Sequence, residues 1–173
     1  MRNTRNRWRA VPYAAVSGAL SLSLLFLGWA APGGVWGIVA LAGLGPAACV
    51  MSAGLGTGFL CWAGVSLLAF LLLPGKFTAL LFAALFGLYP MVKALGERLR
   101  VRGVEYAVKL AFFNASLTVV YFAMRAALTA SLPGALGAVW ALYAVGNVVF
   151  LIYDYGLSRL FALYMKRIQR NIR

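Results

Sequence analysis

The stretch of residues 35–73 contains no charged side chain and is too long for one ordinary membrane-spanning helix. A helix needs about 20 apolar residues to cross the hydrocarbon layer. This stretch therefore predicts two helices joined by a tight turn. Small, flexible residues gather at residues 52–58, and we place the turn there. The alternative break is at residues 43–46, which would otherwise form a kink.

The other apolar runs predict four more spanning helices, separated by turns rich in proline and glycine. We expect these four spans at residues 12–31, 77–92, 104–129 and 136–161. Tyr89-Pro90 is expected to end the fourth span of the chain, because proline interrupts helical hydrogen bonding. Residues 93–102 then form a basic connector, which predicts a short amphipathic helix at the membrane interface.

The distribution of basic residues predicts the orientation of these spans. Lysine and arginine are enriched in cytoplasmic loops. Six spans with an internal N-terminus place the N-terminal arginines, the connector and the basic C-terminal tail on the cytoplasmic side, and leave Lys76 outside. Five spans would place the connector outside. The predicted fold is therefore an all-α, polytopic integral membrane protein. It has six transmembrane helices, a single domain over residues 1–173, and both termini in the cytoplasm.

Composition excludes several classes of function. Sixteen Lys and Arg residues face three Asp and Glu, a net charge of +13, but they flank apolar runs. This pattern favours anionic lipids of the cytoplasmic leaflet over nucleic acid as partners. The chain has no histidine, which excludes a histidine base or a histidine-ligated metal. We therefore expect no enzyme, no metal and no cofactor. Cys49 and Cys61 lack a CxxC spacing, and we interpret them as small buried hydrophobes.

The N-terminal arginines followed by an apolar run resemble a cleavable signal peptide. We expect the first helix to be retained, because residues 11–31 are long enough to span and membranous sequence follows. Compactness and charge bias favour a bacterial inner or plasma membrane.

Polar side chains form a stripe on each of the last two expected helices. On the fifth, four polar residues fall within a wedge of roughly 60° at 100° per residue. On the sixth, the polar positions recur at spacings of four and seven and share a face. The outer parts of the stripes contain Asn114, Thr118, Tyr121, Arg125, Tyr143 and Asn147. These residues predict either interhelical hydrogen bonds or a substrate pocket open to the outside. No acidic residue lies in the outer half beside Arg125, which could snorkel to the surface or hold a carboxylate or phosphate.

The inner half of the same two helices carries charges. Lys109 and Asp154 lie at similar depth, which predicts a structural ion pair that Glu105 and Arg159 could extend. The functional alternative is a proton or ion relay centred on Asp154.

Six compact spans, internal termini and a basic connector after the fourth span resemble the substrate-binding S component of energy-coupling-factor transporters. In that family the first helix carries an Ala-x-x-x-Ala contact with the coupling subunit, matched here by Ala15 and Ala19. The resemblance implies capture of a small solute, vitamin-like or another micronutrient, from outside. A separate coupling membrane subunit and two ATPases would energise its transport. The chain itself has no Walker motif. The alternative is a non-transporting membrane scaffold, similar in outline to small rod-shape-determining membrane proteins.

Overall fold

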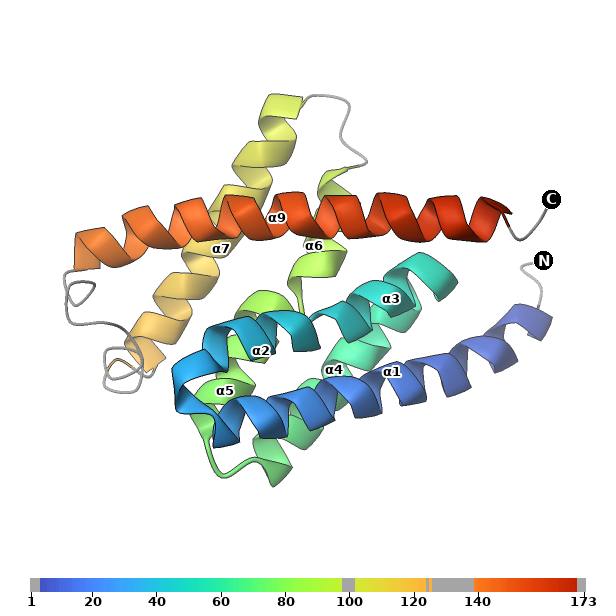
Figure 1. The fold of residues 1–173 in the computed structure, drawn as a ribbon, viewed down its shortest axis with the longest axis horizontal. Coiled ribbons are helices and arrows are strands. Elements are labelled where there is room, and N and C mark those ends of the chain that lie inside the picture. The colour runs from blue at the N-terminus through green and yellow to red at the C-terminus, as the bar shows by residue number, and fades with distance from the viewer. Residues whose placement is uncertain (1–3, 98–101, 124, 126–138, 171–173) are drawn as a thin grey trace. The chain divides into compact units, whose positions relative to one another are not determined.

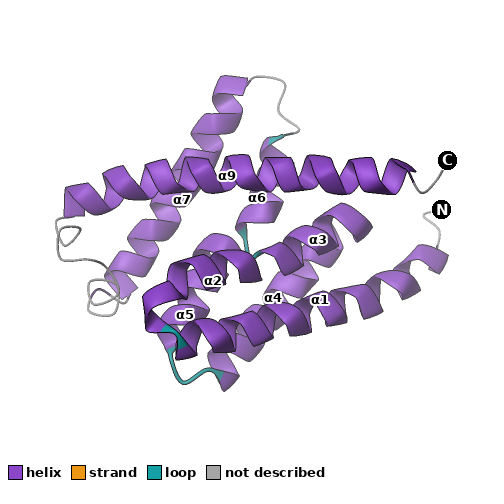
Figure 2. Cartoon of the chain, in the orientation of Figure 1, coloured by secondary structure: helices purple, strands orange, loops and turns teal. Residues whose placement is uncertain are grey.

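The computed structural model describes residues 4–97, 102–123, 125 and 139–170. Every regular element among these residues is helical, and they include no strand (Figure 1 and Figure 2). Within this part of the chain, six segments are long and apolar enough to cross a membrane. The predictions of an all-α fold and of six potential spans are therefore confirmed for the described residues, and they indicate a multi-pass membrane protein.

The spans lie close to the predicted ones. They run over Val11–Ala30, Val35–Ala53, Leu55–Leu72, Lys76–Gly96, Gly103–Ala123 and Trp140–Ala162. Several of them are built from more than one helix. The helices are α1 (Thr4–Ala30), α2 (Val35–Ala42), α3 (Leu44–Ala53), α4 (Leu55–Leu72), α5 (Lys76–Leu81), α6 (Tyr89–Gly96), α7 (Arg102–Ala123) and α9 (Val139–Arg170). The predicted turn after the first span is a 3-10 turn at Pro32–Gly34, which begins with its proline.

The chain divides into two compact units, residues 1–132 and residues 133–173. Helices α1 to α7 belong to the first unit and α9 to the second, and each unit is described by itself. This division leaves the single-domain expectation a prediction.

The uncharged stretch breaks at Gly54, as predicted. Gly54 has φ +89°, a left-handed conformation that costs a glycine little and that other residues rarely adopt. It ends α3 and begins α4, so the chain reverses there. Gly43 lies between α2 and α3 with helical torsion angles, φ −61° and ψ −17°. A Cβ atom at Gly43 would lie 2.6 Å from the Phe86 carbonyl oxygen, so this position interrupts the second span where another segment passes close by.

The fourth span differs from the expectation. It contains a π-helical turn at Phe82–Phe86 between α5 and α6. The prediction that Tyr89-Pro90 ends the helix is wrong, because these two residues begin α6, which continues to Gly96. Proline is well tolerated in the first turn of a helix, where its missing N–H would have no intrahelical partner. Lys93 therefore lies within α6 and is fully buried, which is inconsistent with its predicted place in an interfacial connector.

The core of the first unit is formed where α1 packs against α2, α3 and α4 (Figure 1). Glycines make this packing close. A Cβ atom on Gly45 would lie 2.7 Å from the Ser17 carbonyl oxygen, and one on Gly58 would lie 3.3 Å from the Pro46 carbonyl oxygen. Small residues at helix crossings favour such close approach within membranes. The opposite face of α4 exposes large apolar side chains such as Leu67 and Leu71, as suits a lipid-facing surface.

Candidate functional site

The polar stripe of the fifth span follows one face of α7, in agreement with its predicted spacing. The Asn114 side-chain amide donates to the Leu110 carbonyl oxygen over 2.8 Å. The Thr118 hydroxyl donates to the Asn114 carbonyl oxygen over 2.7 Å. Asn114, Thr118 and Tyr121 are half-buried. Bonds of this type turn the side chains back along their own helix, so they hold the rotamers of the stripe.

Arg125 extends the stripe two residues beyond α7. Its guanidinium carbon lies 5.5 Å from the centre of the Tyr121 ring, a cation–π contact. The Arg125 side chain is exposed. A guanidinium stacked on an aromatic ring retains its planar fork of N–H donors, which suits a carboxylate or phosphate. The structure thus joins two of the predicted site residues directly.

The matching stripe on α9 is described within the second unit. The Asn147 side-chain amide donates to the Tyr143 carbonyl oxygen over 2.7 Å, and both residues are half-buried. This is the same four-residue pattern that Asn114 shows on α7. A pocket that combines Tyr143 and Asn147 with the α7 residues would join the two units, and it stays a prediction.

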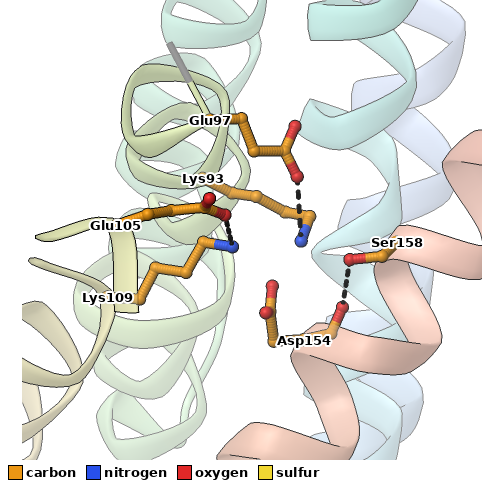
Figure 3. Close-up of polar contacts among 6 residues, drawn as sticks. All are labelled: Lys93, Glu97, Glu105, Lys109, Asp154 and Ser158. Carbon is orange, nitrogen blue, oxygen red and sulfur yellow. Dashed lines mark hydrogen bonds and ion pairs between the residues drawn. The ribbon is translucent and has the colours of Figure 1, made fainter. Parts of the chain in front are cut away.

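Charged residues gather near the end of α6 and the beginning of α7. Lys93 Nζ lies 3.2 Å from a carboxylate oxygen of Glu97, and Lys109 Nζ lies 2.5 Å from a carboxylate oxygen of Glu105 (Figure 3). The lysine side chains are 0% and 4% exposed, whereas their glutamates are 43% and 19% exposed. Each pair spans four residues of one helix. Buried ammonium groups need such partners because desolvation of a lone charge is costly.

A glycine brings the two charged helices together. A Cβ atom on Gly96 would lie 3.7 Å from Glu105 Cγ and 3.9 Å from Lys109 Cε, so α6 contacts the α7 pair directly. The expected partner of Lys109 was Asp154, but the pairing seen on α7 is with Glu105. A Lys109–Asp154 pair would join the two units and stays a prediction.

Around Asp154, the second unit shows bonds along α9. The Ser158 hydroxyl donates to the Asp154 backbone carbonyl oxygen over 2.9 Å (Figure 3). The Arg159 guanidinium donates twice to the Tyr155 hydroxyl, over 2.9 and 2.8 Å. The predicted link between Glu105 and Arg159 would also join the units and stays a prediction. Among the described residues, no group of three or more His, Cys, Asp and Glu is arranged to hold a metal ion.

The predicted partner contact of the first helix lies on the surface of the first unit. Ala15 and Ala19 are both exposed. Gly18, between them in sequence, is buried, and a Cβ atom there would lie 3.2 Å from Val65 of α4. Helix α1 therefore packs on α4 with one face and presents the two alanines on another.

Sequence reasoning missed two polar features of the first unit. The Trp62 indole N–H donates to the Ala83 carbonyl oxygen over 3.0 Å, and so binds α4 to the π-helical turn. Cys61 donates to the Ala14 carbonyl oxygen over 3.7 Å, and so links α4 to α1. The indole N–H of a tryptophan in an apolar run needs an acceptor when it is buried, which was a weak signal for the first of these. No sequence signal marked the second.

Comparisons with known proteins leave the family open. No protein-family model, no curated protein and no solved structure matches this chain.

Proposed function

We propose that this chain is the solute-binding membrane subunit of an energy-coupling-factor-type transporter in a bacterial inner or plasma membrane. Both termini then lie in the cytoplasm, where the basic residues meet anionic lipids. The solute is a small molecule that carries a carboxylate or phosphate. A separate coupling subunit and ATPases supply the energy.

The observation that carries this proposal is the polar stripe of α7. Its polar side chains lie on one face of the second half of α7, where most other residues are apolar, and the stripe ends at a guanidinium stacked on Tyr121. Polar groups in a spanning helix are costly and tend to mark a substrate path or a helix contact. The exposed alanines of α1 support the docking part of the proposal, because small side chains allow another helix to approach.

The docking part is tested by affinity purification of the full chain from its native host in a gentle detergent, followed by mass spectrometry. We expect a coupling membrane subunit and ATPases to co-purify. An Ala15→Leu, Ala19→Leu double variant should lose them, because the larger side chains hold a partner helix away. Val16→Leu is the matched control, since Val16 is an exposed neighbour that is already large. Recovery of cell-envelope or division proteins without an ATPase would contradict the proposal.

The solute-binding part is tested on small molecules that co-purify with the wild-type chain, identified by mass spectrometry. Arg125→Ala should abolish both their retention and the thermal stabilisation that they give. Arg125→Lys keeps the charge but loses the planar fork, and should retain weaker binding. Unchanged retention in Arg125→Ala would exclude this residue from the site.

The alternative is a non-transporting membrane scaffold. It is favoured by the bonds from Asn114 and Thr118 to carbonyl oxygens of their own helix, which give the stripe a structural role. In that case Arg125→Ala changes only helix packing, and no anionic solute co-purifies.

A further inference from the structure

A π-helical turn interrupts the fourth span at Phe82–Phe86, and single turns of this kind are frequent at functional sites. In a π-helix each N–H donates to the carbonyl oxygen five residues back, and the Gly87 N–H donates to the Phe82 carbonyl oxygen over 2.7 Å. In an α-helix the Gly87 N–H would donate to the Ala83 carbonyl oxygen instead. That oxygen accepts the Trp62 indole N–H over 3.0 Å. A side chain of α4 therefore occupies the acceptor that a regular helix would use.

The packing around Gly87 depends on the same indole ring. A Cβ atom on Gly87 would lie 2.8 Å from the Phe82 carbonyl oxygen and 2.8 Å from Trp62 Cδ1. A side chain at this position would collide with both. Glycine thus leaves room for the indole and for the π-type hydrogen bond at once. Trp62 both binds the turn and packs on it, so it stabilises the π-helical form.

A buried hydroxyl close to this contact has no partner in the π-helical form. Ser66 follows Trp62 by one helical turn on the same face of α4, and α4 packs against α5 and against the π-helical turn. The Ser66 side chain is 8% exposed, and its oxygen has no hydrogen-bond partner among the described residues. A buried polar group without a partner raises the free energy of the state that contains it. The π-helical form is therefore not optimal for every group at this contact.

The sequence of α5 also suits a second register. A π-helical turn contains one residue more than an α-helical turn, so its closure would rotate α5 by about 100° and shift it by about 1.5 Å. Each residue of α5 would then take the place now held by the residue before it. The buried residues of α5 are Thr78, Ala79 and Leu81. The residues that would take their places are Ala79, Leu80 and Phe82. All three are apolar, so the second register buries no additional polar group.

Helix α5 is the part that can move, because α6 is fixed on the other side of the turn. The Tyr89 ring of α6 stacks on the Phe112 ring of α7, with ring centres 6.3 Å apart. In contrast, α5 has six residues, and the backbone that joins it to α4 is extended at Leu73 and Gly75. An extended connection can accommodate a shift of one residue.

We propose that the π-helical turn is a two-state switch, in which Trp62 and the Gly87 N–H compete for the Ala83 carbonyl oxygen. In the state seen here the indole binds this oxygen. In the second state the Gly87 N–H binds it, the turn becomes α-helical, and α5 changes register by one residue. Phe82 then accepts from the N–H four residues ahead, so the indole is the one donor that loses its partner in the exchange. This keeps the two states close in free energy.

The switch goes beyond the proposed transport function, because it requires neither a solute nor a coupling subunit. Its atoms belong to α4, α5 and the turn. The turn also packs against α7, the helix with the polar stripe. The two states therefore present different side chains to α7, and small local changes of this kind can be amplified because packed helices have discrete arrangements.

The test determines the register from the neighbour of Trp36 on α2. The rings of Trp36 and Phe77 lie edge to face with centres 6.3 Å apart. In the second state Thr78 would take the place of Phe77. The full chain, with Cys49→Ala and Cys61→Ala, carries Trp36→Cys together with either Phe77→Cys or Thr78→Cys. Each protein is treated in gentle detergent with a short bifunctional thiol reagent, and the intramolecular cross-link is quantified by mass spectrometry. With Trp62 present, we expect mainly the cross-link to position 77 and a smaller amount to position 78.

Two variants should favour the second state through different atoms. Trp62→Phe removes the competing donor, and Gly87→Ala adds a Cβ atom that collides with the Phe82 carbonyl oxygen and the indole. Each should raise the ratio of the position-78 product to the position-77 product about fivefold, the factor expected for one hydrogen bond. The matched controls are Phe59→Leu, which disturbs only the ring contact with Trp62, and Gly64→Ala, whose Cβ position has nothing within 4 Å. Both controls should leave the ratio unchanged.

Three results would overturn the proposal. The first is a ratio in Trp62→Phe and Gly87→Ala equal to that of their controls, because the indole would then only satisfy a carbonyl oxygen. The second is the absence of any cross-link to position 78 when Trp62 is present. The third is that both variants fail to fold while the controls fold, because the state that both favour would then not be a stable fold.

Discussion

Two regions of the first unit accommodate buried polar groups in different ways. Where α1 packs against α2, α3 and α4, uncharged donors form hydrogen bonds between helices, as when the Ser21 hydroxyl of α1 donates to the Ala42 carbonyl oxygen of α2 over 2.8 Å. At the α6–α7 contact the buried groups are full charges, and each lysine pairs with a glutamate on its own helix. The first kind of contact ties helices to one another. The second neutralises charge along a helix and leaves the position of its neighbour to packing.

The difference follows from the cost of each group in an apolar environment. A neutral hydrogen bond contributes about 1 kcal/mol, so it adds to a contact that glycine has already made close. An unpaired buried ammonium group costs several kcal/mol and must have a partner in every conformation of the helix pair. A partner four residues away on the same helix satisfies this need locally. We therefore expect the charged pairs to dominate stability and the neutral bonds to determine how helices align.

The largest effect is expected when Lys109 loses its carboxylate. Glu105→Gln keeps the side-chain shape but removes the charge that faces the 4% exposed lysine. We expect the free energy of unfolding to fall by about 3 kcal/mol, because the buried ammonium group loses a close and mostly buried counter-charge. Unfolding in mixed detergent micelles measures this change.

Glu97→Gln is the matched control for that variant. Glu97 is 43% exposed and remains partly hydrated, so its interaction with Lys93 is screened. Because Lys93 is fully buried, the replacement should still cost about 1–2 kcal/mol, which is less than the cost for Glu105. Equal losses for the two variants would show that burial of the carboxylate does not determine how much each ion pair contributes to stability.

The next effect is steric and concerns the neutral region. Gly45→Ala would place a Cβ atom 2.7 Å from the Ser17 carbonyl oxygen of α1, and closer still to the Ser21 hydroxyl. Backbone atoms cannot rotate away, so α1 and α3 must separate, at a cost of about 2 kcal/mol. Gly37→Ala is the control, because nothing lies within 4 Å of its Cβ position. A tolerated Gly45→Ala would mean that the two helices slide freely past each other.

A somewhat smaller loss is expected when the π-helical turn loses its indole donor. Trp62→Phe keeps an aromatic ring beside Phe59, whose ring centre lies 5.0 Å away, but leaves the Ala83 carbonyl oxygen without this bond. The expected cost is about 1.5 kcal/mol, from the lost hydrogen bond and the smaller ring. Phe59→Leu disturbs only the ring contact and should cost less. Thermal unfolding followed by circular dichroism distinguishes the two variants.

The spans and the turn at Gly54 could be predicted from the sequence because apolar length and glycine content act locally. Burial of Lys93 could not. Hydropathy places a lysine near the membrane surface, and it does not show that Pro90 lies in the first turn of a new helix that begins after the π-helical turn. The wrong helix end and the wrong environment of Lys93 thus have one cause.

For the candidate site too, features within one helix could be predicted, whereas contacts between helices could not. Successive residues of a helix are rotated by 100°. This rotation alone predicts that Asn114, Thr118 and Tyr121 share one face of α7. The pairing of Lys109 with Glu105 follows from their four-residue spacing, whereas the predicted pair with Asp154 depends on how two units meet and stays a prediction. The bond from the Cys61 thiol to the Ala14 carbonyl oxygen depends on how α4 packs against α1, and no residue pattern in the sequence indicates this packing.

The smallest expected effect compares two serines of α1 that lie two residues apart. Ser21 is 1% exposed and donates to α2, whereas Ser23 is exposed and donates to the Ala19 carbonyl oxygen of its own helix over 2.9 Å. Ser21→Ala should lower the free energy of unfolding by about 1 kcal/mol. Ser23→Ala should leave it unchanged within about 0.3 kcal/mol, since a bond back to the preceding turn adds little to a helix. Because both substitutions remove one hydroxyl from the same helix, a difference between them isolates the bond that crosses between helices. Equal effects would contradict this argument, because they would show that a hydrogen bond between two helices stabilises the fold no more than a bond within one helix.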